Sequence, residues 1–406
     1  MTEAEKTGGI GQAGRYGEGI RADARIRVEL REEGGIGLRV VSSVEAFYGK
    51  KIRQEILAGL ESLGVEHALV TVEDRGALPF VLLARLEAAV KRARPETAGR
   101  IEPPGRRDPG PGTAKDRPRR SRLYLPADEP RFLGNPGLFG ADGLILDLED
   151  SVAPGAKDQA RILARNALLC MDFGGAERMV RINPGGEGVK DLEEVVPADP
   201  DLILIPKAED GETVRRVQDA VERIQAESGR ERPIWLMPIV ETAAGVLSAR
   251  EIAAASDRVA ALAVGLEDLT ADLGAERTRE GRESFTARSL VVLAARAAGV
   301  QPIDTVFSDV GDPEGLLESV REARALGFEG KGCIHPSQVE VVHRGFAPSP
   351  EAVEKALRIV KAWEEAREKG LGVVALGAKM IDPPVVKRAL RTVETAREMG
   401  LLKGGE

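Results

Sequence analysis

The chain has 406 residues, of which 42% are hydrophobic and 31% charged, and its formal net charge is −8 at pH 7. This length exceeds one ordinary hydrophobic core and predicts two domains, while the acidic balance argues against nucleic acid or an anionic membrane as partner. The sequence shows neither an apolar run long enough to span a membrane nor a signal peptide, which predicts a cytoplasmic protein.

The first expected domain is a small α+β unit covering residues 15–98. Residues 1–15 are polar and glycine-rich and are expected to be frayed. "ARIRVEL" and "GIGLRVV" predict two strands around a turn at Gly34–Gly35. Ser42 or Ser43 is placed to cap a helix whose apolar residues recur every fourth position. Residues 67–93 predict another strand and a second helix.

Residues 99–118 are predicted to be a linker between the two domains. The segment is rich in proline, glycine and charged residues and has almost nothing to bury. Its prolines should keep it extended.

Residues 119–406 are predicted to form a (β/α)8 TIM barrel with a helical C-terminal extension. The strand candidates are mostly continuously apolar, as expected of strands buried on both faces. They are "SRLYLP", "GLILDLED", "MVRINP", "LILIPKAE", "IWLMPIVET", "VAALAVGLED", "DTVFSDV" and "GKGCIHPSQ". Amphipathic segments separate them, which indicates eight βα units. A doubly wound sheet is the alternative, but the glycine-rich dinucleotide fingerprint is missing after the first strand. From Ser349 onward, two further helices are expected, with Pro350 at the first position of the first helix.

Polar and charged side chains recur where these strands end. They are Asp147, Glu149 and Asp150, then Arg181 and Asn183, Lys207 and Glu209, Glu241 and Thr242, Glu267 and Asp268, and finally His335. The carboxyl ends of barrel strands form the active-site face, so these side chains should lie on one rim. Burying so many charges is costly unless a cation and an anionic ligand lie between them. With few histidines and no CxxC pair, a metal here should be Mg²⁺ or a similar hard ion held by oxygen ligands.

Each of these residues also has a purely structural explanation. Asp147 or Asp150 could cap the following helix, and Lys207 could be a solvated strand end. Arg181 needs a carboxylate partner, which could be Glu149 acting structurally. His335 is better explained as a residue that orients a loop than as a metal ligand.

At this point the sequence resembles a known family. "RRSRLYLPADEP", "LILDLEDSV", "VRIN", "LIPKAE", "IVETAAG", "GLEDL", "CIHPSQ" and "GAKMIDPP" resemble, in order, the citrate lyase beta-subunit and CoA-ester lyase group of the HpcH/HpaI aldolase superfamily. The N-terminal stretches "DARIRVEL", "VSSVEAFYGKKIR" and "VEDRGALPFVLLARLEA" are similar to the citrate lyase gamma subunit, an acyl carrier protein.

The resemblance implies roles for particular residues of the barrel. Glu241 and Asp268 stand where the family binds Mg²⁺, and Arg181 where it binds the carboxylate of the oxo acid. Glu149 and Asp150 match acids that lie near the waters of the metal and help to bind substrate.

Two further positions and the oligomeric state also follow from the resemblance. Asp382, in "KMID", matches an acid/base that reaches into the site of a neighbouring subunit. Arg122, in the first strand, matches a contact to the phosphates of CoA. A homotrimer is usual in the family.

The reaction implied is the reversible retro-Claisen cleavage of a citryl-, citramalyl- or malyl-CoA type thioester into acetyl-CoA and a 2-oxo acid. Three alternatives remain open. They are a malyl-CoA-type thioesterase that uses the same metal, a non-catalytic assembly subunit of a citrate lyase complex, and an aldolase acting on free oxo acids. The "KMID" tail resembles the CoA-using branch, which disfavours the aldolase.

The carrier-like domain departs from its family at one position. Carrier subunits have a serine shortly before the first strand that bears a covalent CoA-like prosthetic group, and here Arg21 stands at that place. An arginine has no hydroxyl to form the phosphodiester. The domain is therefore predicted to keep the fold without the carrier function, so that the barrel acts on diffusible CoA thioesters. Modification of Ser42 or Ser43 after a shift in register is the alternative.

Overall fold

The computed structural model describes residues 9–368, 374–376 and 379–402. It divides into two compact units, Met1–Val339 and Glu340–Glu406. Within the described residues, no helix combines the length and the apolar character needed to cross a membrane.

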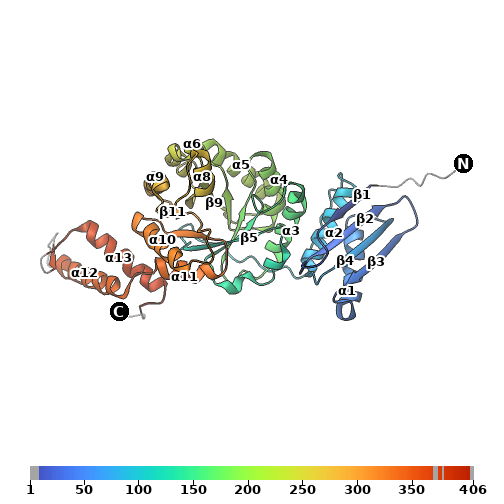
Figure 1. Ribbon diagram of the computed structural model, residues 1–406, viewed down its shortest axis with the longest axis horizontal. Coiled ribbons are helices and arrows are strands. Elements are labelled where there is room, and N and C mark those ends of the chain that lie inside the picture. The colour runs from blue at the N-terminus through green and yellow to red at the C-terminus, as the bar shows by residue number, and fades with distance from the viewer. Residues whose placement is uncertain (1–8, 369–373, 377–378, 403–406) are drawn as a thin grey trace. The chain divides into compact units, whose positions relative to one another are not determined.

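The chain begins with a four-stranded sheet and two helices (Figure 1). The elements are β1 (Ile10–Ala13), β2 (Ala24–Leu30), β3 (Ile36–Ser42), α1 (Glu45–Ser62), β4 (Ala68–Asp74) and α2 (Pro79–Ala93). Alternate residues of β2 and β4 are buried, including Ile26, Val28, Val70 and Val72. This period of two shows that one face of the sheet is covered, by α2 over β1 and β2 and by α1 beside β3.

The strand pairing in this part differs from the prediction in two ways. The sheet order is β1-β2-β4-β3, so the two strands flanking Gly34–Gly35 are not neighbours. Instead α1 returns the chain so that β3 pairs in parallel with β4. Residues 10–13, expected to be frayed, form β1 and pair antiparallel with β2.

The start of α1 also differs from the prediction. The N-cap residue is Val44, and no side chain caps the helix. The Ser42 hydroxyl donates to Asp74 Oδ2 at 2.5 Å and accepts from the Val44 amide at 3.1 Å. Ser42 therefore joins the ends of β3 and β4 rather than the first turn of α1.

Residues 99–118 contain no helix or strand, yet they are fixed to their surroundings. Ile101 is buried, and its amide donates to Glu87 Oε2 at 2.8 Å. The Thr113 hydroxyl donates to Glu177 Oε1, and the Thr113 carbonyl accepts from the Trp235 indole at 2.8 Å. The segment has more to bury than its composition suggested.

Eight parallel strands then close into a barrel, which confirms the predicted fold. They are β5 (Ser121–Pro126), β6 (Gly143–Asp147), β7 (Glu177–Arg181), β8 (Leu202–Ile205), β9 (Trp235–Val240), β10 (Ala261–Val264), β11 (Gln301–Asp304) and β12 (Gly330–Cys333). The strand β12 pairs with β5 and completes the ring. Since β11 begins at Gln301, it starts before the expected segment "DTVFSDV".

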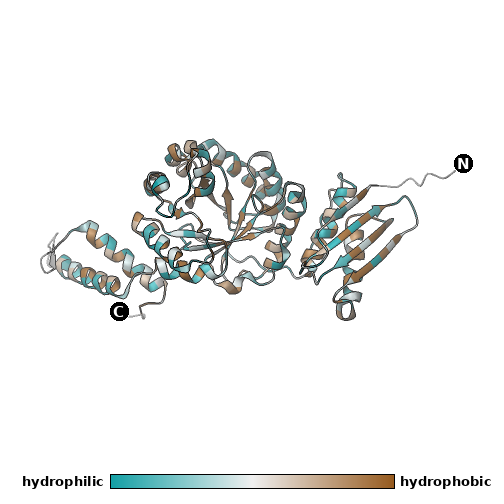
Figure 2. Cartoon of the chain, viewed as in Figure 1, coloured by the Kyte–Doolittle hydropathy of each residue, from teal (hydrophilic) through white to brown (hydrophobic). Residues whose placement is uncertain are grey.

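Helices follow the strands around the outside of the ring (Figure 1). They are α3 (Lys157–Cys170), α4 (Gly185–Val195), α5 (Gly211–Ser228), α6 (Ala243–Leu247), α7 (Ala249–Ala253), α8 (Leu266–Leu273), α9 (Arg282–Ala298), α10 (Pro313–Leu326) and α11 (Ser337–Phe346). Figure 2 shows much of the barrel strands in brown, in agreement with their burial. The barrel interior holds a cluster of fully buried side chains that includes Ile145, Met179, Leu204, Met237 and Ile303.

The second unit is a helical hairpin with a small ribbon. It contains α12 (Pro350–Glu368), β13 (Val374–Leu376), β14 (Lys379–Ile381) and α13 (Pro383–Glu398). The Ser349 hydroxyl accepts from the Ala352 amide at 3.2 Å and caps α12, as expected. The two helices bury Ile359 and Val386 between them.

Candidate active site

The charged side chains expected on one rim stand at or just after the carboxyl ends of the barrel strands. Asp147 is the last residue of β6 and Arg181 is the last residue of β7. Glu241 directly follows β9, and Asp268 lies in the first turn of α8 after β10. In a closed parallel barrel these ends share one face, so the fold gathers the four residues on the rim.

Arg181 is held by three carboxylates of the chain itself. Its Nε and Nη2 atoms donate to Asp147 Oδ1 and Oδ2 at 2.7 and 2.8 Å. Its Nη1 atom lies 2.8 Å from Glu149 Oε2 and 3.5 Å from Asp150 Oδ2. The ring of Tyr124 lies 5.2 Å from the guanidinium carbon. Arg181 therefore has a buried carboxylate partner, as expected. The main partner is Asp147, and not Glu149 as the sequence suggested.

The Asp147–Arg181 pair is charged in the folded protein. Burial alone would raise the pKa of Asp147, but the hydrogen bonds and charge of Arg181 outweigh it and lower this pKa. Burial likewise opposes the charge of Arg181, yet the bonds to Asp147 raise the pKa of the guanidinium. The pair fixes the direction of Arg181, and its Nη1 atom faces Glu149 and Asp150.

Glu149 is buried between two cations and remains incompletely satisfied. Its Oε1 atom lies 3.4 Å from Lys207 Nζ. Its Oε2 atom is close to Arg181 Nη1, but the angle is not that of a hydrogen bond, and no other donor reaches it. Burial raises the pKa of Glu149; Arg181 opposes this shift and the charge of Asp150 adds to it. A positive ligand or a donating water would stabilise this oxygen.

Glu241 is strongly affected by its surroundings. Only 3% of its surface is exposed, and its Oε1 atom accepts from the Lys207 amide at 2.6 Å. Burial raises the pKa of Glu241 to about 7; the amide opposes this, while the charges of Asp268 and Glu149 add to it. Lys207 has φ +50°, the left-handed conformation that non-glycine residues avoid. The backbone at Lys207 is therefore strained at the residue whose N–H donates to Glu241.

Glu241 and Asp268 fit a hard divalent cation. Their carboxylate oxygens are hard ligands, and the charges of Asp268 and Glu149, which help to raise the pKa of Glu241, show that negative charge accumulates here. Among the residues that the structure describes, no group of three or more His, Cys, Asp or Glu side chains surrounds a single metal position. Mg²⁺ does not need one, because it commonly keeps several waters and takes only one or two protein carboxylates.

Gly265 leaves the room that Glu241 occupies. A Cβ atom at this position would lie 2.5 Å from Glu241 Oε2 and 2.9 Å from Glu241 Cβ, and the latter cannot rotate away. We predict that Gly265→Ala lowers the affinity for Mg²⁺ by about tenfold, because it displaces the Glu241 carboxylate that is expected to hold the ion. Isothermal titration checks this. Gly134→Ala, where a Cβ meets nothing within 4 Å, is the control; equal affinities in the two variants would contradict the prediction.

Arg122 lies elsewhere than expected. It is only 2% exposed, its Nη1 atom lies 3.1 Å from Met237 Sδ, and its Nη2 atom donates to the Asp304 carbonyl at 3.3 Å. Burial lowers the pKa of this guanidinium. This placement inside the barrel argues against the expected contact to the phosphates of CoA.

The remaining predicted residues have local partners. Asp382 belongs to the second unit, where it is the N-cap of α13 and accepts from the Val385 amide at 3.2 Å. This is the structural role considered for it. His335 Nδ1 contacts the Ser337 hydroxyl at 2.8 Å and orients the start of α11, as its structural explanation required.

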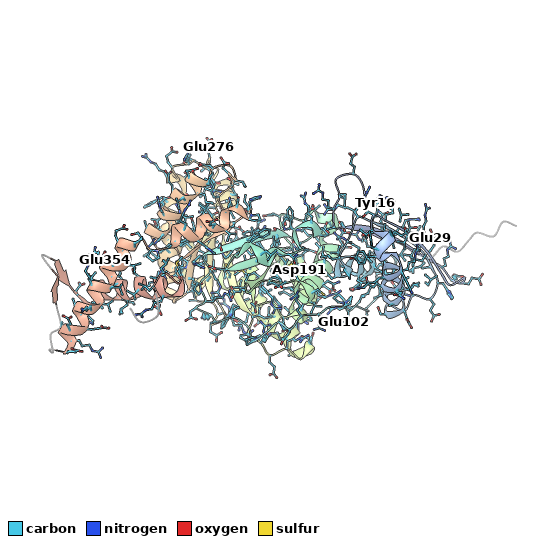
Figure 3. All side chains as sticks on the ribbon, turned by 90° about the horizontal axis from the view of Figure 1, so that it is seen from below. Tyr16, Glu29, Glu102, Asp191, Glu276 and Glu354 are labelled. Carbon is cyan, nitrogen blue, oxygen red and sulfur yellow. The ribbon has the colours of Figure 1, made fainter. Side chains whose placement is uncertain are left out.

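Three further residues support the rim, of which only Asn183 was expected there from the sequence. Asn183 Nδ2 donates to the Leu148 carbonyl at 2.9 Å. Asp191, labelled in Figure 3, accepts from the amide and the side chain of Asn183 at 2.8 and 2.7 Å. Lys157 donates to the carbonyls of Leu148 and Glu149. Lys157 and Asp191 were missed, because neither carries a signal in the sequence.

Fold and rim together define a (β/α)8-barrel enzyme with an acidic, metal-binding type of site. Residues 120–336 match the family model described as HpcH/HpaI aldolase/citrate lyase, and residues 13–93 match the carrier model described as malonate decarboxylase delta subunit. The chain therefore belongs to the HpcH/HpaI aldolase/citrate lyase family and carries a carrier-like domain at its N-terminus.

Curated relatives and solved structures agree with this assignment. Citrate lyase subunit beta of Leuconostoc mesenteroides subsp. cremoris is 37% identical over 69% of this chain and 94% of that protein. Human mitochondrial citramalyl-CoA lyase is 34% identical over 69% of this chain and 86% of its own length. The structure of protein CitE from Mycobacterium tuberculosis in complex with magnesium, acetoacetate and coenzyme A is 33% identical, covers 71% of this chain and all of its own, and has a TM-score of 0.57. The chain is thus a lyase of this family.

Proposed function

We propose that this lyase cleaves a citryl-, citramalyl- or malyl-CoA type thioester to acetyl-CoA and a 2-oxo acid, with Mg²⁺ held by Glu241 and Asp268. The observation that carries the proposal is the rim itself. There Arg181 is fixed by Asp147 with one edge left toward Glu149, near two metal-type carboxylates. Relatives that bear the names of citrate lyase and citramalyl-CoA lyase support it.

In this proposal the side chains of the rim bind and orient the substrate. Arg181 receives the carboxylate of the oxo-acid half on its Nη edge, sharing that edge with Glu149 and Asp150. Asp147 keeps the guanidinium from rotating, so the bound carboxylate is oriented for cleavage. When bound, Mg²⁺ would polarise the oxygen on the carbon that becomes the ketone. Loss of Arg181 should therefore cost several kcal/mol of transition-state stabilisation.

Asp382 is proposed as the acid that protonates the acetyl carbon after cleavage, and as the base in the reverse direction. In a homotrimer, as we propose for this chain in the cytoplasm, it would act in the site of a neighbouring subunit. Residues 119–406 would then be the catalytic part, residues 99–118 the connection, and residues 15–98 the carrier-like domain.

An assay with three thioesters tests the proposed function. Purified protein with Mg²⁺ is given citryl-, citramalyl- and malyl-CoA in turn, and acetyl-CoA, 2-oxo acid and free CoA are followed. Acetyl-CoA and oxo acid in equal amounts from one thioester support the lyase. Free CoA with the intact hydroxy acid would show a thioesterase instead. That alternative is kept because (3S)-malyl-CoA thioesterase of Cereibacter sphaeroides is 36% identical over 70% of this chain.

The carrier-like domain is proposed not to bear a prosthetic group. Arg21 is exposed in the loop before β2, and Ser42, the nearest serine downstream, is bonded to Asp74. We predict that the intact mass of protein from its native host equals the sequence mass. A mass increase of a CoA-derived group on any serine of residues 1–98 would contradict this and restore a working carrier.

A further inference from the structure

The N-terminal domain contacts the barrel at the beginning of α3. Arg92, on α2, donates through Nε and Nη2 to the two carboxylate oxygens of Asp158, each at 2.6 Å. Its Nη2 atom also donates to the Gly155 carbonyl at 3.0 Å, and its Nη1 atom to the Gln12 carbonyl of β1 at 2.6 Å. A bidentate pair of this kind fixes both distance and direction.

A second contact lies beside the first and is fully buried. Arg85, also on α2, is 0% exposed and joins Asp23 of its own domain at 2.9 Å to Asp128 of the barrel at 2.6 Å. Gln159 donates to both oxygens of Asp128 at 2.9 and 3.0 Å, and its carbonyl oxygen accepts from the Gly14 amide. Asp128 follows β5, so this contact reaches the same barrel face as the rim. Removing one partner of such a buried pair is strongly destabilising, because it leaves the other charge buried and unpaired.

The same end of α3 also holds the loop that carries Glu149. Lys157 Nζ donates to the Leu148 carbonyl at 2.7 Å and to the Glu149 carbonyl at 2.5 Å. Lys157 directly precedes Asp158 and Gln159. Lys157 therefore binds the loop of residues 148–150, while the next two residues bind the N-terminal domain. The position of residues 148–150 therefore depends on the position of the first turn of α3.

We propose that the carrier-like domain of residues 15–98, together with β1 before it, forms a positioning domain for the active site. Arg92 fixes the first turn of α3 through Asp158, and Lys157 transmits this position to the loop of Leu148, Glu149 and Asp150. The domain thus keeps a carrier fold but acts as a fixed support, because a carrier that visits a site would have to break the buried pairs of Arg85. The effect on turnover rests on the proposed function; the effect on the loop does not.

Hydrogen exchange of the loop tests the proposal without reference to activity. The amides of Leu148 and Val152 are bonded to the carbonyls of Arg181 and Glu149 and should exchange slowly. In Arg92→Met and in Lys157→Met we expect exchange of residues 148–152 to become about tenfold faster. Asp158→Asn tests the same pair from the barrel side. Arg53→Met is the matched control, since it removes an exposed ion pair with Glu45 within the N-terminal domain.

Turnover provides the second readout, on the thioester that the wild type cleaves. Arg92→Met and Lys157→Met should each lower kcat about tenfold with KM unchanged, and the double variant should be no slower than Lys157→Met, because both changes act along one route. Unchanged exchange of the loop in both Arg92→Met and Asp158→Asn would overturn the proposal, as would fully additive losses in the double variant. A wild type that cleaves no thioester would refute the proposed function and leave the exchange result decisive.

Discussion

Glu241→Gln is expected to abolish Mg²⁺ binding and turnover while making the metal-free protein more stable at pH 8. The change keeps the shape of the side chain and the acceptor for the Lys207 amide, but it removes the charge that a metal needs. Turnover should fall by at least about a thousandfold, as for the loss of other strong electrostatic groups in active sites. Stability and metal binding change in opposite directions. The buried carboxylate destabilises the metal-free protein, but the protein needs it to bind Mg²⁺.

The gain in stability follows from the raised pKa of Glu241. This pKa moves from an ordinary 4.5 to about 7, so the folded protein binds the proton more tightly than the unfolded chain. Stability therefore falls as the pH rises from about 4.5 to about 7, and the full cost is present above that range. At about 1.4 kcal/mol per pKa unit, the difference between 4.5 and about 7 corresponds to a cost of roughly 3–4 kcal/mol. Glutamine avoids it, so the variant should gain stability in chelator at pH 8 and nothing at pH 4.

Titration calorimetry and thermal unfolding in chelator at both pH values measure these effects. Glu267→Gln is the control, because Glu267 precedes Asp268 but is exposed and paired with Arg277. In the wild type, Mg²⁺ affinity should also weaken as the pH falls below 7, since the proton on Glu241 competes with the metal. A Glu241→Gln protein that still binds Mg²⁺ would exclude Glu241 as a ligand.

Much of the barrel could be predicted from the sequence because its strands are apolar runs with few other interpretations. The partner of Arg181 could not be predicted, since three acids, Asp147, Glu149 and Asp150, lie within four residues at the end of β6. The register decides it: Asp147 pairs directly with Arg181 across β6 and β7. Register depends on the whole ring of strands and leaves no local trace in the sequence.

Arg122 shows how the surroundings of a strand residue were overlooked. It is the second residue of β5 and lies four positions before Pro126, where the strand ends. Its guanidinium is buried and contacts Met237 of β9 and the carbonyl of Asp304 in β11. The sequence motif does not reveal these neighbours, because they come from distant strands of the barrel.

The neighbours of the strands in the N-terminal sheet could not be predicted, for a different reason. A glycine pair between two strands is typical of a hairpin, yet Gly34–Gly35 here joins β2 to a strand on the far side of β4. The contacts by which α3 supports the rim could likewise not be predicted from the sequence. Lys157 and Arg92 are far apart in the chain, and each resembles an ordinary surface cation. Both depend on contacts between segments that only the fold brings together.

Asp382→Asn is expected to lower kcat by about a hundredfold or more while KM and thermal stability stay near those of the wild type. Asparagine caps helices as well as aspartate does, so the bond from the Val385 amide and the start of α13 should persist. The acid is nevertheless lost. Asp312→Asn is the matched control, because Asp312 caps α10 in the same way through the Gly315 amide and has no proposed role in the reaction.

Mixing two inactive proteins tests whether Asp382 acts in a neighbouring subunit. Asp382→Asn retains Glu241, and Glu241→Gln retains Asp382, so an exchanged oligomer contains some sites with both groups intact. In a cyclic oligomer mixed in equal parts, about a quarter of the sites should combine them, and about a quarter of the wild-type activity should return. Exchange is checked by mass spectrometry of the mixed oligomers. If subunits exchange and no activity returns, Asp382 does not complete its neighbour's site, and the loss of activity in Asp382→Asn then arises within its own subunit.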